Sequence, residues 1–333
     1  MPSKICFKCG YTSDEPMDFC KNCRINLNQD YDLDTNLYAH PADVKARSAL
    51  GKMKPVKIAV QAFMNKLGMR WIKATLLGSA VRVSERQFPH IHKIVVEAGK
   101  VLAVKRLPQV YVRYDPYMNA MALGTTEEPI IVLTSALVDA MNENELRMVI
   151  GHEMGHIRNE HVIYLTLLYA LRSGLASVLA GPLQLTIKGV DLAILAWMRK
   201  SEYTADRAGL IVCRDLQIAK RTLMKIHLGS KKLFDQVDLE EYERQIEELD
   251  EEKIGKWSEL ELSHPFGVRR LRNIEEFYQD PAYTEIREIV ESYLKGKPVE
   301  RAKLASTVLR CPECHEIVDP EDKFCPYCGA RLR

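Results

Sequence analysis

Two histidines and a glutamate stand at a spacing that suits metal-assisted hydrolysis. His152 and His156 are four residues apart, so on a helix both rings lie on one face and can bind one metal ion. Glu153 lies one step around that helix, close enough to handle a water molecule on the metal. This H-E-x-x-H arrangement provides two imidazole ligands and a general base, and it is typical of zinc-dependent peptide hydrolysis.

The residues before this motif predict the helix that must present it. Asn142 suits the N-cap position, Glu145 stands where a capping box places its glutamate, and an apolar run follows. The motif therefore falls on a helix whose other face is apolar. This favours a metal site over the alternative of two histidines on a solvated helix.

A third ligand is needed if one position on the metal is to stay open for water. Glu202 and Asp206 are four apart and share a helical face. Glu202 would complete a His-His-Glu set, and Asp206 could accept a hydrogen bond from a ligating ring. The alternative is a solvated acidic pair, and that pair alone would not indicate a site.

Together these motifs resemble the HtpX and type I CAAX prenyl protease family of zinc metallopeptidases, which includes the Ste-type and Oma-like proteases. The H-E-M-G-H stretch is followed later in the chain by Glu-Tyr-Thr-Ala-Asp. Three further stretches agree with the family pattern, namely 119–124, 130–137 and 263–271. The resemblance runs from about residue 80 to about residue 275.

The resemblance implies one catalytic zinc whose ligands are His152, His156 and Glu202. It makes Glu153 the general base that takes a proton from the zinc-bound water and passes it to the leaving amine. Asp206 becomes an outer partner that orients a ligating ring. No serine or cysteine nucleophile is required.

The resemblance also assigns residues to the substrate. Asn119 and Ala120 would lie on an edge strand that pairs with an extended peptide backbone. His264 or Arg270 would stabilise the oxyanion as it develops, and the sequence does not choose between them. The alternative for His264 is an ordinary turn, since a proline follows it.

The cysteines predict two further zinc sites. Eight of the nine stand in two frames of the same C-x2-C-x10-C-x2-C spacing, offset by 305 residues (311 − 6): Cys6, Cys9, Cys20 and Cys23, then Cys311, Cys314, Cys325 and Cys328. Paired C-x-x-C knuckles supply four thiolates to a structural zinc. We expect no signal peptide, and without an oxidising compartment disulfides are disfavoured. A redox-active C-x-x-C pair is also disfavoured, because no βαβ pattern lies beside it. Cys213 is left over and is expected to be a plain buried thiol.

The two predicted zinc ribbons do not indicate nucleic-acid binding. Acidic residues offset the basic ones in both, and neither is a basic patch with interleaved aromatics. Docking of partner or substrate proteins, or self-association, is the expected role. One ribbon could also cover the cleft and gate access to it.

The length and the net charge of the chain limit its possible domain organisation and binding partners. The 333 residues carry 47 basic and 45 acidic side chains, a net charge of +2, which gives no pull toward nucleic acid or an anionic membrane. We expect an N-terminal zinc ribbon at 1–27, a linker at 28–47, and a catalytic domain at 48–295. A second linker at 296–308 then leads to the C-terminal ribbon at 309–333.

The apolar segment 162–197 raises the question of a membrane. Arg172 interrupts it, and no stretch reaches 18 residues without a charge. A central arginine costs about 2.5–3.5 kcal/mol on insertion scales. We therefore expect a cytoplasmic enzyme, with a helical hairpin of 162–197 resting on the cytoplasmic face of a membrane as the alternative.

The expected fold is α+β and mostly helical, a zincin-like (gluzincin) domain with a small sheet plus two small zinc ribbons of four cysteines each. Strands are expected near 109–114, 120–124 and 130–134, and an acidic helix near 235–256 either packs on the domain or forms a lid. The favoured function is a zinc endopeptidase acting on extended or unfolded protein segments. The alternative is a zinc-ribbon adaptor with a latent peptidase domain, which would have no need of Glu153.

Overall fold

The computed structural model describes residues 3–28, 30–50, 68–172, 184–251, 264–297 and 331, and its centre is a four-stranded sheet. The strand order is β3 (Ala80–Arg82), β4 (Gln109–Arg113), β6 (Pro129–Thr134) and β5 (Ala120–Gly124). β6 runs parallel to β4 and antiparallel to β5, and β3 is antiparallel to β4. β5 therefore lies at one edge of this sheet.

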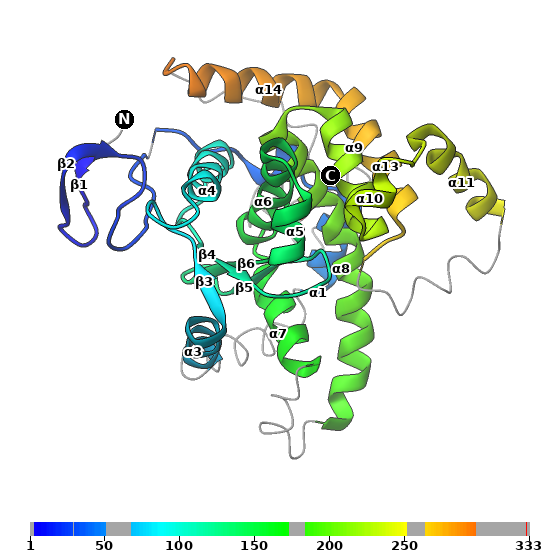
Figure 1. Cartoon of the computed structure of the whole chain (residues 1–333), viewed down its shortest axis with the longest axis horizontal. Coiled ribbons are helices and arrows are strands. Elements are labelled where there is room, and N and C mark those ends of the chain that lie inside the picture. Colours follow the sequence, from blue (N-terminus) through cyan, green and yellow to red (C-terminus); the bar gives the residue numbers. More distant parts are fainter. Residues whose placement is uncertain are drawn as a thin grey trace.

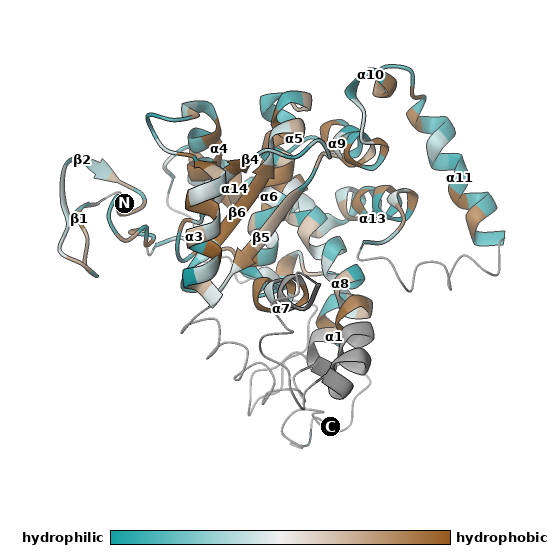
Figure 2. Ribbon diagram, turned by 60° about the horizontal axis from the view of Figure 1, so that its bottom comes forward, coloured by the Kyte–Doolittle hydropathy of each residue, from teal (hydrophilic) through white to brown (hydrophobic). Residues whose placement is uncertain are grey.

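Alternating side chains of the sheet enter two different layers. Ile131 and Leu133 join the main core, whereas Ile130 and Val132 pack with α3 (Met69–Ser79). This is the period-two pattern of a strand that is buried on both faces. The apolar strands between helices are visible in Figure 2.

Helices form most of the remaining described chain (Figure 1). In chain order they are η1 (Thr35–Leu37), α1 (Pro41–Leu50), α4 (Pro89–Val101), α5 (Ser135–Ala140), α6 (Glu143–Arg158), α7 (Val162–Arg172), α8 (Gln184–Cys213), α9 (Leu216–Leu228), α10 (Lys231–Phe234), α11 (Leu239–Glu251), α13 (Gly267–Gln279) and α14 (Pro281–Leu294). The α+β, mostly helical class expected from the sequence is confirmed.

The start of α6 has the predicted capping box. Asn142 accepts backbone hydrogen bonds from Asn144 and Glu145, and the Glu145 carboxylate accepts one from the backbone of Asn142 at 2.9 Å. Lys225 of α9 adds a buried ion pair, with its Nζ 2.6 Å from Oε1 and 2.7 Å from Oε2 of Glu145. This ion pair connects the beginning of α6 to α9. The sequence did not reveal Lys225 as the partner of Glu145.

Small residues let α6 and α8 approach closely. A Cβ added to Gly155 would lie 2.7 Å from the Cβ of Ala208 and 3.1 Å from the Cα of Ala205. One added to Gly151 would lie 2.8 Å from the Cβ of Val212. Since the nearest atoms belong to backbone and to short side chains, little room exists for adjustment. The two helices are thus in contact over the turns that carry the H-E-x-x-H motif.

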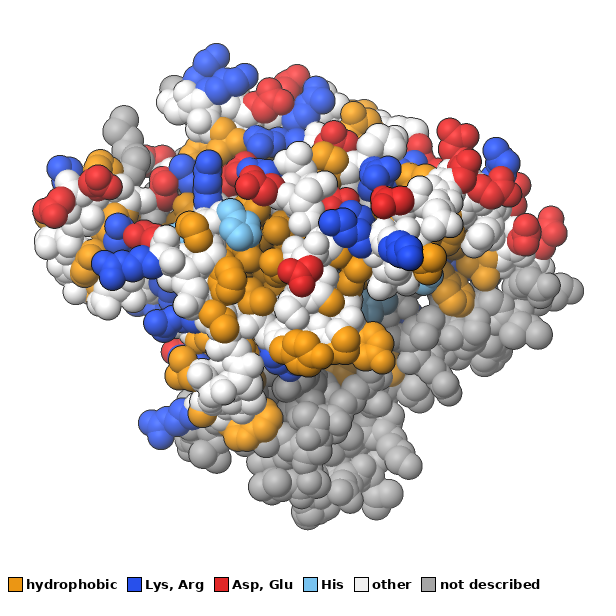
Figure 3. Space-filling model, viewed as in Figure 1, with side chains coloured by type: hydrophobic (Ala, Val, Ile, Leu, Met, Phe, Trp, Pro, Cys, Tyr) orange, Lys and Arg blue, Asp and Glu red, His pale blue; other side chains and the backbone are white. Residues whose placement is uncertain are grey.

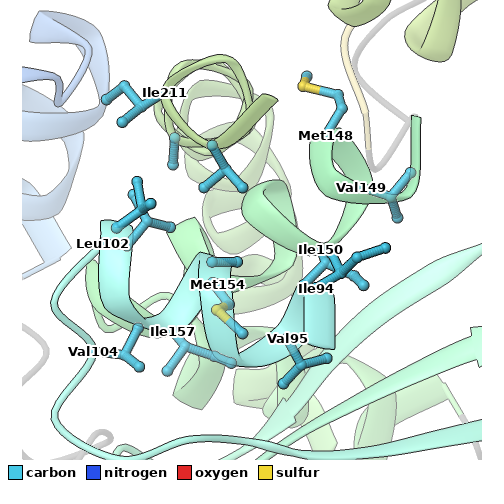
Figure 4. Packing of buried hydrophobic residues seen from close by; sticks show 14 of the residues in the cluster. Ile94, Val95, Leu102, Val104, Met148, Val149, Ile150, Met154, Ile157 and Ile211 are labelled. Carbon is cyan, nitrogen blue, oxygen red and sulfur yellow. The ribbon is translucent and has the colours of Figure 1, made fainter. Parts of the chain in front are cut away.

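Apolar side chains of α4 and the far side of α6 complete the core. Ile94 and Val95 of α4 meet Ile150, Met154 and Ile157 of α6, as Figure 4 shows. All five are buried. The motif helix is therefore fixed by apolar contacts on one side and by α8 on the other.

The N-terminal ribbon is joined to the catalytic domain by backbone pairing. Its hairpin consists of β1 (Ser3–Ile5) and β2 (Thr12–Met17). The amide of Leu107 donates to the carbonyl of Arg24 at 2.9 Å, and the Arg24 guanidinium donates to the carbonyl of Leu107 at 3.0 Å. Phe19 enters the main core. The predicted C-terminal ribbon lies outside the described residues.

The segment 28–47, expected to be a linker, packs against the catalytic domain. Tyr31, Leu33 and Tyr38 are buried in the main core. Tyr31 stacks on Tyr293 of α14 with ring centroids 3.8 Å apart, and its hydroxyl donates to the carbonyl of Val101 at 2.8 Å. The sequence predicted a linker here, but these apolar side chains bury surface that holds the segment against the domain.

Among the described residues, no helix combines the length and apolarity needed to cross a membrane. Part of the 162–197 hairpin alternative, residues 173–183, lies outside them. The predicted acidic helix is α11, which buries Ile246 and carries exposed acidic side chains along its length (Figure 3). The expected strands are present, and β3 is an additional one.

We predict that Gly155→Ala destabilises the protein by about 1–3 kcal/mol, because the added methyl must push α8 away. Gly78→Ala is the matched control: this helical glycine has no atom within 4 Å of the added Cβ, so we expect a neutral change or a gain of up to about 1 kcal/mol. Urea unfolding of both zinc-loaded variants measures the difference. Equal stabilities would contradict the close approach of the two helices.

Candidate metal centre

α6 and α8 bring three of the predicted site residues together in the interior. Nε2 of His152 lies 3.2 Å from Nε2 of His156, and Oε1 of Glu202 lies 3.2 Å from the same atom of His156. The potential ligand atoms of these three residues all lie within 4.8 Å of one another. His152, His156 and Glu202 are all buried.

The donor set fits a zinc ion. Two imidazole nitrogens and a carboxylate oxygen form a known catalytic set that leaves a fourth position for water. Oε2 of Glu202 is buried and accepts no hydrogen bond from the part of the chain that the structure describes. A buried carboxylate oxygen without a hydrogen bond, beside two converging ring nitrogens, is a position that a metal cation would satisfy.

Glu153 lies beside this set. Its side chain is buried and lines, with His152 and Glu202, a cavity of about 300 Å³. Burial raises the pKa of Glu153, and the nearby rings of His152 and His156 oppose that rise. The structure thus puts a carboxyl group with an elevated pKa in the cavity that the metal-binding set faces.

Asp206 lies behind the set, and Arg270, which also lines the cavity, pairs with it. Oδ1 of Asp206 lies 2.9 Å from Nδ1 of His152. Arg270 donates through Nε to Oδ2 of Asp206 at 2.8 Å and through Nη2 to Oδ1 at 2.6 Å, and its Nη2 is 3.4 Å from Oε2 of Glu202. One guanidinium therefore serves two buried carboxylates.

Arg270 and the neighbouring histidines together set the charge state of the acidic pair. Burial alone would raise the pKa of both Glu202 and Asp206. His264, His156 and Arg270 nevertheless bring the pKa of Glu202 well below its ordinary value, and Arg270 with His152 lowers that of Asp206. Both carboxylates are consequently held ionised, as a metal ligand and its outer partner must be.

The remaining predicted residues line the same cavity. Asn119 and Ala120 border it at the beginning of β5, where the backbone amide of Asn119 donates to Oγ1 of Thr134 at 2.9 Å. His264 stands at the mouth with 56% of its side chain exposed and Nε2 3.6 Å from Oε2 of Glu202. Apolar side chains line the rest of the cavity, among them Met148, Val149, Leu223 and Ile226.

The outer nitrogen of His156 has a partner that the sequence analysis missed. Nδ1 of His156 lies 3.1 Å from Nδ1 of His161, and Nε2 of His161 lies 3.1 Å from Oδ2 of Asp43. His161 follows the motif closely in sequence, and this proximity was the only available signal. Asp43 lies in the segment expected to be a linker, so nothing local pointed to it.

The N-terminal cysteines form a second metal-binding cluster. Sγ of Cys6 lies 3.6 Å from Sγ of Cys23, and Sγ of Cys9 lies 3.6 Å from Sγ of Cys20. All four sulfurs are within 4.8 Å of one another. Four thiols at this spacing fit the tetrahedral structural zinc of a ribbon. The second set of four, Cys311, Cys314, Cys325 and Cys328, lies outside the described residues.

A His-His-Glu set on two packed helices, with a glutamate beside it and a cysteine cluster apart from it, defines a zinc metallopeptidase of the H-E-x-x-H type. The chain belongs to Peptidase family M48, whose family model matches residues 85–278. A zinc-ribbon domain model matches residues 308–332. The family resemblance drawn from the sequence is confirmed.

Relatives of known name agree with this assignment. The chain is 28% identical over 263 residues to Plastoglobule-localized metallopeptidase 48, chloroplastic, of Arabidopsis thaliana, a match that covers 77% of this chain and 76% of that protein. It is 34% identical over 103 residues to a Protease HtpX homolog of Streptococcus pyogenes and 35% identical over 106 residues to one of Streptococcus thermophilus. These two matches cover 31% and 32% of this chain, and 34% and 35% of the respective relatives. No solved structure shows significant similarity to the chain.

We predict that Arg270→Gln lowers the stability of the protein by about 3 kcal/mol or more, because it leaves two buried carboxylates without their cation. Arg272→Gln is the matched control on the same helix: its partner Asp250 is partly exposed, and such a pair contributes less than about 1 kcal/mol. Urea unfolding of the zinc-loaded proteins gives both values. An Arg270 variant as stable as the Arg272 variant would contradict this charge balance.

Proposed function

We propose that this metallopeptidase is an endopeptidase that cleaves extended or unfolded protein segments, as in quality control or processing. The observation that carries the proposal is the position of Glu153, buried beside the metal-binding set and lining the cavity that the set faces. A site that only bound peptides would have no use for a buried carboxyl group there.

The edge of the sheet supports an extended substrate. β5 pairs with β6 on one side and has no strand on its other side in the four-stranded sheet. Its first residues, Asn119 and Ala120, border the cavity. A peptide added to that edge would hydrogen-bond through its backbone, which selects extended segments over folded ones.

We propose one catalytic zinc held by His152, His156 and Glu202, with one structural zinc in each ribbon. When bound, the catalytic ion supplies a water of lowered pKa and polarises the scissile carbonyl. Glu153 then accepts the proton of that water at its carboxylate and delivers it to the departing amine. Its burial suits this work, because a raised pKa lets the carboxyl group hold the proton between the two transfers.

His264 is our proposed stabiliser of the oxyanion. Both hydrogen bonds of the Arg270 fork go to Asp206, which commits that guanidinium to the acidic pair. His264 is more than half exposed at the mouth of the cavity and so can approach a substrate carbonyl. Arg270 acts instead by keeping Asp206 and Glu202 in place.

We expect Glu153→Gln to lower the cleavage of an unfolded protein such as casein by at least about 100-fold, the contribution of a positioned proton carrier. The amide has the same shape but cannot accept the proton, so zinc content should stay at three ions per chain. Glu143→Gln, an exposed glutamate in the first turn of the same helix, is the control and should cleave normally.

Two results would count against this. A Glu153 variant that cleaves like the wild type would remove the proposed role of Glu153. A wild-type chain that binds three zinc ions and cleaves no unfolded protein would favour the alternative, a ribbon adaptor with a latent peptidase domain.

We expect His264→Asn to lower kcat by about 100-fold or more, as removal of an oxyanion donor does, without loss of zinc. His227→Asn is the control, because this exposed histidine lines another part of the same cavity. Steady-state kinetics with a fluorogenic peptide and zinc analysis check both variants. Loss of zinc with the activity would show instead that His264 positions Glu202.

A further inference from the structure

His161 turns back onto the metal centre because of the way α6 ends. The amide of His161 donates to the carbonyl of His156 at 2.9 Å, and the amide of Glu160 donates to that of Ile157 at 3.2 Å. Glu160 has a left-handed backbone with φ of 61°. These are the two hydrogen bonds and the αL residue of a Schellman motif, which reverses the chain after a helix. The reversal brings the ring of His161 against the outer side of His156.

Asp43 reaches the same place from α1. Its carboxylate accepts hydrogen bonds from Nε1 of Trp197 at 2.9 Å and from Oγ1 of Thr204 at 2.7 Å, both on α8. Neither His161 nor Asp43 is exposed to solvent. A buried carboxylate with two donors and an imidazole 3.1 Å away has a fixed position.

The spacing of these rings determines where their protons lie. An imidazole that binds a metal through Nε2 carries its proton on Nδ1, which then needs an acceptor. Nδ1 of His161, 3.1 Å away, is an acceptor only if the proton of that ring is on Nε2. The negative charge of the Asp43 carboxylate, with Oδ2 3.1 Å from that Nε2, favours this tautomer electrostatically.

We propose that His161 and Asp43 are positioning residues of the metal centre, through which the N-terminal segment fixes the tautomer and orientation of His156. The inference rests on the proposed role of His156 as a zinc ligand. His152 is oriented directly by Asp206, whereas His156 is oriented by a carboxylate acting through a second imidazole. The two ligands thus depend on different parts of the chain.

The test compares four variants of the full-length chain: His161→Phe, His161→Gln, Asp43→Asn and Tyr38→Phe. Phenylalanine fills the space of His161 but cannot accept from His156. Glutamine offers an oxygen toward His156 and an amide N–H toward Asp43, so it can restore the connection. Tyr38→Phe is the matched control, since it removes a buried hydroxyl that contacts Asn159 at the end of α6 and leaves the ring pair intact.

The readouts are the affinity of the active-site metal, measured by chelator competition, and the visible spectrum of the cobalt(II)-loaded protein. The His-His-Glu site and the thiolate sites differ in their cobalt absorption, so the catalytic ion can be followed separately. We expect His161→Phe and Asp43→Asn to weaken zinc binding at this site by about 10–100-fold. His161→Gln should stay within a few-fold of the wild type, and Tyr38→Phe should lose stability but not zinc affinity.

Wild-type zinc affinity in His161→Phe would overturn the proposal. So would equal losses in the glutamine and phenylalanine variants, or a loss in Tyr38→Phe as large as theirs, because each would reveal general packing. If the affinities rank as expected while the wild type cleaves no protein, the positioning role stands and the proposed peptidase function fails.

Discussion

The contact between α6 and α8 is the constraint on which the rest of the structure depends. A metal-binding set drawn from two helices requires their axes to be close, and small residues allow that where Gly155 faces Ala205 and Ala208 and Gly151 faces Gly209. The close approach has an electrostatic cost, because α8 brings the carboxylates of Glu202 and Asp206 into buried positions. Arg270 offsets this cost by pairing with both carboxylates. The residues that let the helices approach and the residue that balances their charge therefore lie in the same region.

The residues in and around the metal-binding set come from segments that are far apart in the sequence. α6 and α8 supply the metal-binding set and Glu153, α13 supplies Arg270, and α1 supplies Asp43. Each outer group acts by fixing one inner group in its charge state or tautomer. Rigid placement of this kind is what a metal centre needs if its ligands are to bind without rearranging.

The features that could be predicted from the sequence are those set by residues close together in the chain. Helical spacing places His152, His156 and Glu202 on facing surfaces, and the Asn142–Glu145 capping box is written into four consecutive residues. His161 escaped notice because its chain reversal uses Glu160 in a conformation that normally signals itself by glycine. Asp43 and Lys225 escaped because their partners are 161 and 80 residues away, and composition cannot report such pairings.

Residues near position 30 and near position 293 meet beside the core. Tyr31 stacks on Tyr293, and the side-chain amide of Asn28 donates to the hydroxyl of that same tyrosine across a separation of 265 residues. Contacts of this length form only after nearly all of the chain is available. In a chain emerging from the ribosome, the H-E-x-x-H helix is therefore made well before α13, which supplies Arg270, so the metal centre can be completed only late in synthesis.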